Sequence, residues 1–192
     1  MKQDRRVART RGALQHAYLC LMNVHQEHEI TVSMIADEAD INRATFYAHF
    51  SNKEDFLEEM LYELLMGFEQ AILDVFQGKR KINAAKLTPT TEVMFQYIEA
   101  HQQAFYALSK GHHDFDKRLE KLFHGLFTEK IFIETESPLG ELNYEIFIQY
   151  QTKATLSLLQ YWIKSKYANS KAYMMEQLTL LSNTKIKSLN RI

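Results

Sequence analysis

Two short amphipathic segments joined by a four-residue turn constrain the fold of this chain more than any other feature. Thr31 precedes the first segment, residues 32–38, and Asn42 precedes the second, residues 43–49. Both are residue types whose side chains cap helix N-termini. Asp40 lies in the turn and tolerates the left-handed backbone conformation. The pattern predicts two short helices packed across each other, which is a helix-turn-helix.

The apolar residues of this motif are spaced so that they share an inner face. Ala36 is small, so the second helix can cross closely over the first. Ile35, Ile41 and Phe46 fill the wedge between the helices, and Phe50 anchors the wedge to supporting helices. The polar side chains of the second segment are therefore expected on the outer side.

An outward-facing helix of this width fits the DNA major groove, and its first residues approach the base edges. We expect Thr45, with Arg43 and Ala44, to read bases, and the remaining polar residues to contact phosphates without reading sequence. The predicted DNA-binding residues are Thr31, Ser33, Asn42, Arg43, Ala44, Thr45, Tyr47, His49 and Lys53.

The charge of the chain is unevenly distributed. The net charge is −1, which excludes a wholly basic nucleic-acid coat, yet the first eleven residues carry five basic side chains and one acidic one. Such asymmetry indicates an anionic partner. The alternative is a solvated, disordered tail.

The rest of the chain is predicted to be helical, which makes the fold all-α. Only two prolines and six glycines occur in 192 residues, and both types disfavour helix interiors. Residues 78–90 contain Gly78, a basic triplet and Pro89, and they mark the clearest boundary. The further helices are expected at residues 5–26, 52–76, 89–108, 114–134, 139–167 and 170–189.

The stretch TVSMIADEADINRATFYAHFSNKEDFLEEM, residues 31–60, resembles the DNA-binding domain of TetR-family transcriptional regulators. The resemblance extends over about residues 8–68, and the INRATFY variant is similar to a subgroup common in Gram-positive bacteria. Many family members have Gly where this chain has Asp40. The residues that match the family pattern are Thr31-Val32, Ile35-Ala36, Thr45-Phe46-Tyr47, His49-Phe50 and Lys53-Glu54.

The resemblance implies two domains with different functions. Residues 1–68 would form a three-helix DNA-binding domain with its motif at 31–50, and residues 69–192 a helical domain for effector binding and dimerisation. A ligand-responsive homodimeric repressor that binds a DNA operator is then expected. Neither a catalytic residue nor a cofactor is expected, and the absence of an 18-residue apolar run favours a soluble cytoplasmic protein.

Two C-terminal segments are expected to carry the dimer contacts. The segment 139–167 is apolar over more than one face, so it must be buried on several sides. In the family, the last two helices form a four-helix dimer interface. The alternative is the core of a monomer. The residues expected at the interface are Leu158, Trp162, Met174, Leu178 and Leu181.

Aromatic residues of the C-terminal part are candidates for an effector pocket, since family members often bind small apolar or amphipathic molecules. Aromatic side chains at helical spacing also fill ordinary cores. The candidate pocket residues are Tyr97, Phe105, Tyr106, Phe123, Phe127, Phe147 and Tyr150.

The sequence contains few other residues that could bind a metal or act as a nucleophile. His25 and His28 flank Glu27, but their spacing and order match no zinc-protease motif. A second group, His112-His113-Asp114, lies in an expected loop. We expect neither to bind a metal. Cys20 is the only cysteine and is expected to be a packed thiol.

Two other functions remain open. A coactivator on the same fold could work through another protein without touching DNA, and Asp37, Glu38 and Asp40 put negative charge near the motif. A small-molecule enzyme would need a paired acid and base in the C-terminal part, and the sequence offers no such pair.

Overall fold

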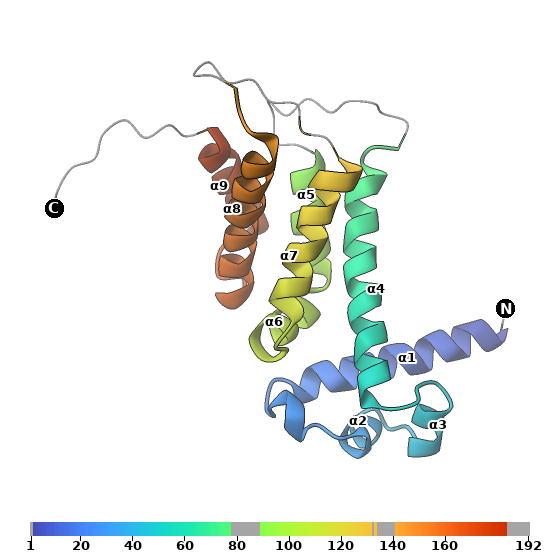
Figure 1. Cartoon of the computed structure of the whole chain (residues 1–192). Coiled ribbons are helices and arrows are strands. Elements are labelled where there is room, and N and C mark those ends of the chain that lie inside the picture. The colour runs from blue at the N-terminus through green and yellow to red at the C-terminus, as the bar shows by residue number, and fades with distance from the viewer. Residues whose placement is uncertain (1, 78–88, 132, 134–140, 184–192) are drawn as a thin grey trace. The chain divides into compact units, whose positions relative to one another are not determined.

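The computed structural model describes residues 2–77, 89–131, 133 and 141–183. Every regular element within these ranges is helical and none is a strand (Figure 1), which confirms the predicted all-α class. None of the helices in the described ranges is both long and apolar enough to cross a membrane. The predicted boundary at residues 78–90 falls almost entirely outside the described residues.

The chain forms two compact units. The first is made of Met1–Gly67 and His101–Leu119, and the second of Phe68–Ala100 and Glu120–Ile192. The first unit therefore takes a segment from the middle of the sequence in addition to its N-terminal part.

The first unit is built from short helices around the N-terminal helix. Its elements are α1 (Lys2–Leu21), the 3-10 helix η1 (Glu27–Glu29), α2 (Val32–Glu38), α3 (Arg43–Tyr47), the first part of α4 (Lys53–Asp74), α6 (Gln102–Gly111) and the start of α7 (Phe115–Gly125). In Figure 1, α2 and α3 lie beneath the N-terminal end of α4.

The core of the first unit is aromatic. Tyr18 of α1 meets Phe56 of α4 edge to face, with ring centroids 5.7 Å apart, and both side chains are fully buried. Burying a phenylalanine ring such as that of Phe56 contributes roughly 1.5–3 kcal/mol. Helix α6 packs on α1, where a Cβ at Gly111 would lie 2.6 Å from Met22 Cε. The Met22 side chain would have to shift to make room for a larger residue at this position.

The second unit is centred on Trp162. Its elements beyond the shared α4 and α7 are α5 (Pro89–Ala100), the π-helical turn η2 (Leu126–Lys130), α8 (Tyr144–Lys164) and α9 (Lys171–Asn183). The Trp162 ring lies 5.2 Å from Phe95, and its Nε1 donates to the Asn169 carbonyl at 2.8 Å. Helix α9 packs against both α5 and α8.

Three predicted helices differ from the observed ones. The segment predicted as one helix at 89–108 is divided at His101, whose φ of −115° and ψ of 27° break the helix. The first helix ends at Leu21 rather than near residue 26, and α7 ends at Gly125 before the π-helical turn. Residues 184–189 of the last predicted helix lie outside the described residues.

Candidate nucleic-acid interface

Both predicted caps of the helix-turn-helix are confirmed. The Thr31 hydroxyl accepts a hydrogen bond from the Met34 amide at 3.3 Å, and the Asn42 side chain accepts one from the Ala44 amide at 2.7 Å. Each cap satisfies an amide that has no partner inside its helix. The first turns of α2 and α3 are therefore fixed by their own sequence.

The turn between α2 and α3 depends on one unusual backbone conformation. Asp40 has a φ of 53°, as its residue type predicted. This conformation reverses the chain, so the Ile41 amide donates to the Ala36 carbonyl at 2.9 Å and the Asp40 amide to the Asp37 carbonyl at 3.1 Å. The two bonds close the C-terminal end of α2 and set the direction in which α3 begins.

An aromatic cluster holds α3 from behind. Phe46 is fully buried and lies 5.4 Å from Phe50 and 5.7 Å from Phe56, while Phe50 and Phe56 are 5.0 Å apart. Ile35 and Ala36 of α2 are also fully buried, as predicted. Because Phe46 faces inward at the middle of α3, the neighbouring residues on the helix must face outward.

The predicted contact residues lie at the surface of the first unit. Tyr47 is 50% exposed and its ring meets Phe46 edge to face at 5.6 Å. Thr31, Asn42, Arg43 and Ala44 are exposed, and Ser33, Thr45, His49 and Lys53 are half-buried. None of these side chains belongs to the buried core.

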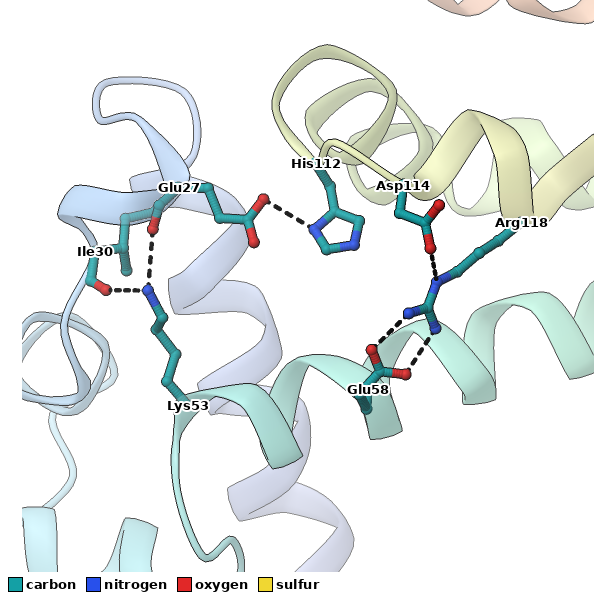
Figure 2. A network of polar contacts seen from close by, with 7 residues as sticks. All are labelled: Glu27, Ile30, Lys53, Glu58, His112, Asp114 and Arg118. Carbon is teal, nitrogen blue, oxygen red and sulfur yellow. Dashed lines mark hydrogen bonds and ion pairs between the residues drawn. The ribbon is translucent and has the colours of Figure 1, made fainter.

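Lys53 has a structural task that its position in the sequence does not reveal. Its ammonium group donates to the backbone carbonyls of Glu27 at 3.1 Å and Ile30 at 2.9 Å (Figure 2). It thereby ties the start of α4 to the connection between α1 and α2. Two of the three donors of this ammonium group are thus used within the protein.

Charges of both signs surround the motif. Arg5, Arg6 and Arg9 lie exposed on α1, which begins at Lys2, so these residues belong to a helix rather than to a disordered tail. Arg11 is committed to the fold, because it pairs with Glu59 and Glu63 and lies over the Phe50 ring at 4.9 Å. The acidic residues Asp37, Glu38 and Asp40 are exposed.

The turn between α6 and α7 is bound to the helix-turn-helix part of the first unit by polar contacts that sequence reasoning missed. Arg118 donates to both carboxylate oxygens of Glu58 at 2.6 Å and to Asp114 at 3.0 Å (Figure 2). His112 Nδ1 lies 2.9 Å from the Glu27 carboxylate. The Glu58–Arg118 and Glu27–His112 pairs are 60 and 85 residues apart in sequence, so no local pattern could have identified them. The Asp114–Arg118 pair, in contrast, has the local i,i+4 spacing.

Arg118 changes the acidity of its partners. Its hydrogen bond lowers the pKa of Glu58 and the pKa of Asp114 below their ordinary values, and the same pairing with Glu58 raises the pKa of Arg118. All three groups are therefore charged at neutral pH. A bidentate arginine–carboxylate pair fixes orientation as well as distance.

The seven predicted effector-pocket residues do not form one group within a unit. In the second unit, the Phe68 ring lies 5.4 Å from Tyr97 and 5.7 Å from Phe123, and Phe127 lies 6.3 Å from Phe123. Phe105 is fully buried in the first unit, which also contains the half-buried Tyr106.

The other two predicted pocket residues lie on α8. Phe147 is half-buried near Tyr144, and Tyr150 is 70% exposed. Tyr150 is therefore presented to the surroundings of the chain rather than to an enclosed cavity of the second unit.

The residues predicted at the dimer interface differ in how exposed they are within the single chain. Trp162 and Met174 are each 1% exposed within the single chain, so neither has surface to offer a second subunit, and we withdraw both from the predicted interface. Leu158 and Leu178 are half-buried, whereas Leu181 is exposed. The large apolar side chains that α8 and α9 do expose are Ile146, Tyr150, Tyr161, Tyr173, Leu180 and Leu181.

Comparison with known proteins agrees with a helix-turn-helix that binds DNA. Residues 27–60 match the family model described as bacterial regulatory proteins of the tetR family, and residues 85–184 match a model described as a transcriptional regulator C-terminal region. An uncharacterized HTH-type transcriptional regulator YxbF of Bacillus subtilis (strain 168) is 49% identical over 59 residues. That alignment covers 30% of this chain and 16% of the relative's length.

Solved structures share the fold over nearly the whole chain. The dihydroxyacetone kinase operon activator DhaS is 20% identical with a TM-score of 0.59, and the match covers 90% of this chain and 93% of DhaS. A TetR regulator from Streptococcus agalactiae 2603V is 18% identical with a TM-score of 0.59, over 94% of this chain and 97% of the other.

The fatty acid degradation regulator FadR from Bacillus halodurans is 15% identical with a TM-score of 0.61. The match covers 90% of this chain and 93% of FadR. Identities this low show the fold alone. Together with the capped helix-turn-helix and the two family-model matches, they establish that this chain belongs to the TetR family of helix-turn-helix DNA-binding transcriptional regulators, which is not a family of enzymes.

Proposed function

We propose that this chain is a homodimeric, ligand-responsive repressor that binds an operator through α3. The observation that supports this most directly is the orientation of α3, where Phe46 is fully buried while Arg43, Ala44 and Tyr47 are exposed. An exposed helix held from behind by a packed aromatic cluster is suited to the major groove.

The roles of the side chains follow from their chemistry. Arg43 can donate two hydrogen bonds to a guanine, and Ala44 or the Thr45 methyl group can contact a thymine methyl group. Tyr47, His49, Thr31 and Ser33 are proposed to contact phosphates, which fix the register of the protein on the duplex. Asn42 caps α3 and presents that helix to the groove.

The proposed dimer uses α8 and α9. Three large exposed side chains lie on one face of α8. Tyr150 follows Ile146 by four residues and Tyr161 follows it by fifteen, and both spacings are close to whole turns of a helix. The exposed Ala154 and Ser157 lie on this face as well, and their small side chains permit close approach of another helix. A two-fold dimer would present two copies of α3 to successive major grooves.

An effector would act on this dimer by favouring one arrangement of the two recognition helices. The shift equals the difference in its affinity for the DNA-competent and DNA-incompetent states. We propose that residues 69–192 carry effector binding and dimerisation, with Tyr97, Phe123 and Phe127 as the residues nearest a common centre. A cytoplasmic location accompanies this proposal.

A fluorescence-anisotropy titration with DNA from upstream of the chain's own coding sequence tests the proposal. Thr45→Ala should weaken operator binding by about 1–3 kcal/mol, which is roughly 5- to 150-fold in affinity. Tyr47→Ala should weaken binding to the operator and binding to unrelated DNA by the same factor. Tyr62→Ala is the matched control, because Tyr62 is 65% exposed on α4. Operator affinity that does not fall with rising salt would contradict DNA binding.

A coactivator that binds a protein partner rather than DNA is the second candidate. Asp37, Glu38 and Asp40 are exposed at the helix-turn-helix, and their negative charge opposes the approach of phosphates. Asp37→Asn with Glu38→Gln distinguishes the two functions. The double variant should bind DNA more tightly if α3 meets a duplex, and should lose its partner if the acidic surface meets a protein.

A further inference from the structure

Two sequence motifs that are each too weak to indicate a metal site meet in the first unit. Glu27 comes from the 3-10 helix η1, and His112 and His113 follow the last residue of α6. One potential ligand atom from each of these three side chains lies within 4.8 Å of the other two. The imidazole rings of His112 and His113 have centroids 5.0 Å apart. Folding thus assembles a carboxylate and two imidazoles from positions 85 residues apart.

The His112 imidazole is buried and already lies against one of the other two side chains of the cluster. Its side chain is only 5% exposed, and Nδ1 lies 2.9 Å from Glu27 Oε2. The other ring nitrogen, Nε2, is buried and has no hydrogen-bonding partner among the described residues. Because Nδ1 is the ring nitrogen that faces Glu27, a cation bound by both side chains would take the place of the proton between Nδ1 and the carboxylate.

The surroundings of the cluster allow a ligand to enter. A surface recess of about 860 Å³ in the first unit is lined by Glu27 and His113. The recess is also lined by His25, His28, Glu29, Glu54, Lys53 and Lys110. The Lys53 ammonium, which would oppose a cation, is turned onto two backbone carbonyls. Three imidazoles and three carboxylates therefore border one opening.

We propose that Glu27, His112 and His113 bind a divalent transition-metal cation of the Zn²⁺ class. Imidazole nitrogen with carboxylate oxygen suits Zn²⁺, Ni²⁺ and Cu²⁺ rather than Mg²⁺ or Ca²⁺, which prefer oxygen ligands alone. Metal–ligand distances of about 2.0–2.2 Å require the three ligand atoms to draw together. The exposed His113 ring can supply this movement. The bound cation would join the α1–α2 connection to the α6–α7 turn.

Calorimetric titration of Zn²⁺ into the full-length, chelator-treated chain tests this inference. We expect one cation per chain, and visible absorption bands of nitrogen-ligated Co²⁺ when Co²⁺ replaces Zn²⁺. His113→Ala and Glu27→Gln should each weaken Zn²⁺ binding by at least about tenfold. Both positions retain some exposure, so circular dichroism should show folded variants even if His112→Gln fails to fold.

His124→Gln is the matched control, because it removes one imidazole from outside the cluster and should leave Zn²⁺ affinity unchanged. If His113→Ala and His124→Gln reduced Zn²⁺ affinity equally, the cation would be bound by histidines scattered over the chain, and the proposal would be overturned. Zn²⁺ affinity unaffected by either His113→Ala or Glu27→Gln would overturn it as well. The measurement involves no DNA, so its outcome is independent of the proposed operator binding.

Discussion

At the scale of single residues, the helix-turn-helix depends on a few side chains with local tasks. Asp40 holds a φ of 53°, a conformation that costs most L-residues roughly 1–2 kcal/mol. Asp tolerates it better than most because its short polar side chain can hydrogen-bond locally. Thr31 and Asn42 cap the two helices on either side of this turn. The direction of α3 thus follows from three polar residues and the core behind it.

Substitutions at Asp40 should separate the backbone requirement from the charge. Asp40→Gly should change the free energy of unfolding by less than about 1 kcal/mol, since Gly adopts positive φ freely. Asp40→Val should lower it by about 1–2 kcal/mol, because a β-branched residue is strained there. Urea unfolding followed by circular dichroism measures both. Equal stability of the two variants would show that the turn has rearranged.

Lys53 should matter more for stability than an exposed lysine. Lys53→Met removes two charge-assisted hydrogen bonds to the Glu27 and Ile30 carbonyls, so the free energy of unfolding should fall by about 1–3 kcal/mol. Lys121→Met, at an exposed position on α7, should change it by less than about 0.5 kcal/mol. Chemical denaturation compares the two variants. Indistinguishable midpoints would mean that water replaces the lysine at no cost.

At the scale of elements, the α6–α7 turn is held by ion pairs rather than by apolar packing alone. Arg118 of α7 joins Glu58 of α4 and Asp114 of its own turn. Exposed pairs contribute little individually, but a bidentate arginine shared by two carboxylates is better ordered than an isolated pair. The pairing makes this turn sensitive to acid.

The stability of the chain should fall on acidification in part through Arg118. Because the pKa values of Glu58 and Asp114 are lowered in the folded chain, their contribution is complete above about pH 5 and is lost as pH falls through the lowered values. Arg118→Gln should therefore flatten the decline in unfolding free energy between about pH 5 and pH 3. Urea unfolding at a series of pH values measures it, and parallel curves for the two proteins would rule out the coupling.

At the scale of the whole molecule, the exposed apolar residues of α8 and α9 are the feature that a single chain explains least. Tyr150, Tyr161, Tyr173 and Leu180 are large, apolar and exposed on adjacent helices. Several large apolar side chains exposed on two packed helices are candidates for an interaction site. A second copy of the chain would cover it.

Charge placed on this surface should dissociate the proposed dimer. Tyr150→Lys would bury two unpaired cations at a two-fold interface, and an unpaired buried charge costs about 3–5 kcal/mol. The dimer dissociation constant should then rise by about 100-fold or more, as measured by analytical ultracentrifugation. Tyr62→Lys makes the same change on exposed α4 and should leave the dimer intact. Unchanged association of Tyr150→Lys would exclude this face.

The sequence predicts best where structure is local. The caps at Thr31 and Asn42, the positive φ of Asp40 and the burial of Phe46 follow from residue types and spacing, and the structure confirms all of them. The break at His101 carries no Gly or Pro signal in the sequence. Trp162 is buried rather than available to a partner because Phe95 and Tyr167 enclose it, which no helical period could show.

The way α6 joins the first unit determines how the protein can be divided. Helix α6 and the α6–α7 turn pack on α1 and pair with Glu27 and Glu58, although they come from residues 101–119. A fragment truncated after residue 68 would expose the surface of α1 that α6 covers, together with Met22, which directly follows α1 and which Gly111 approaches. Chimaeras that exchange operator preference between relatives would therefore have to transplant α6 along with the N-terminal helices, so the recognition module is discontinuous in the gene.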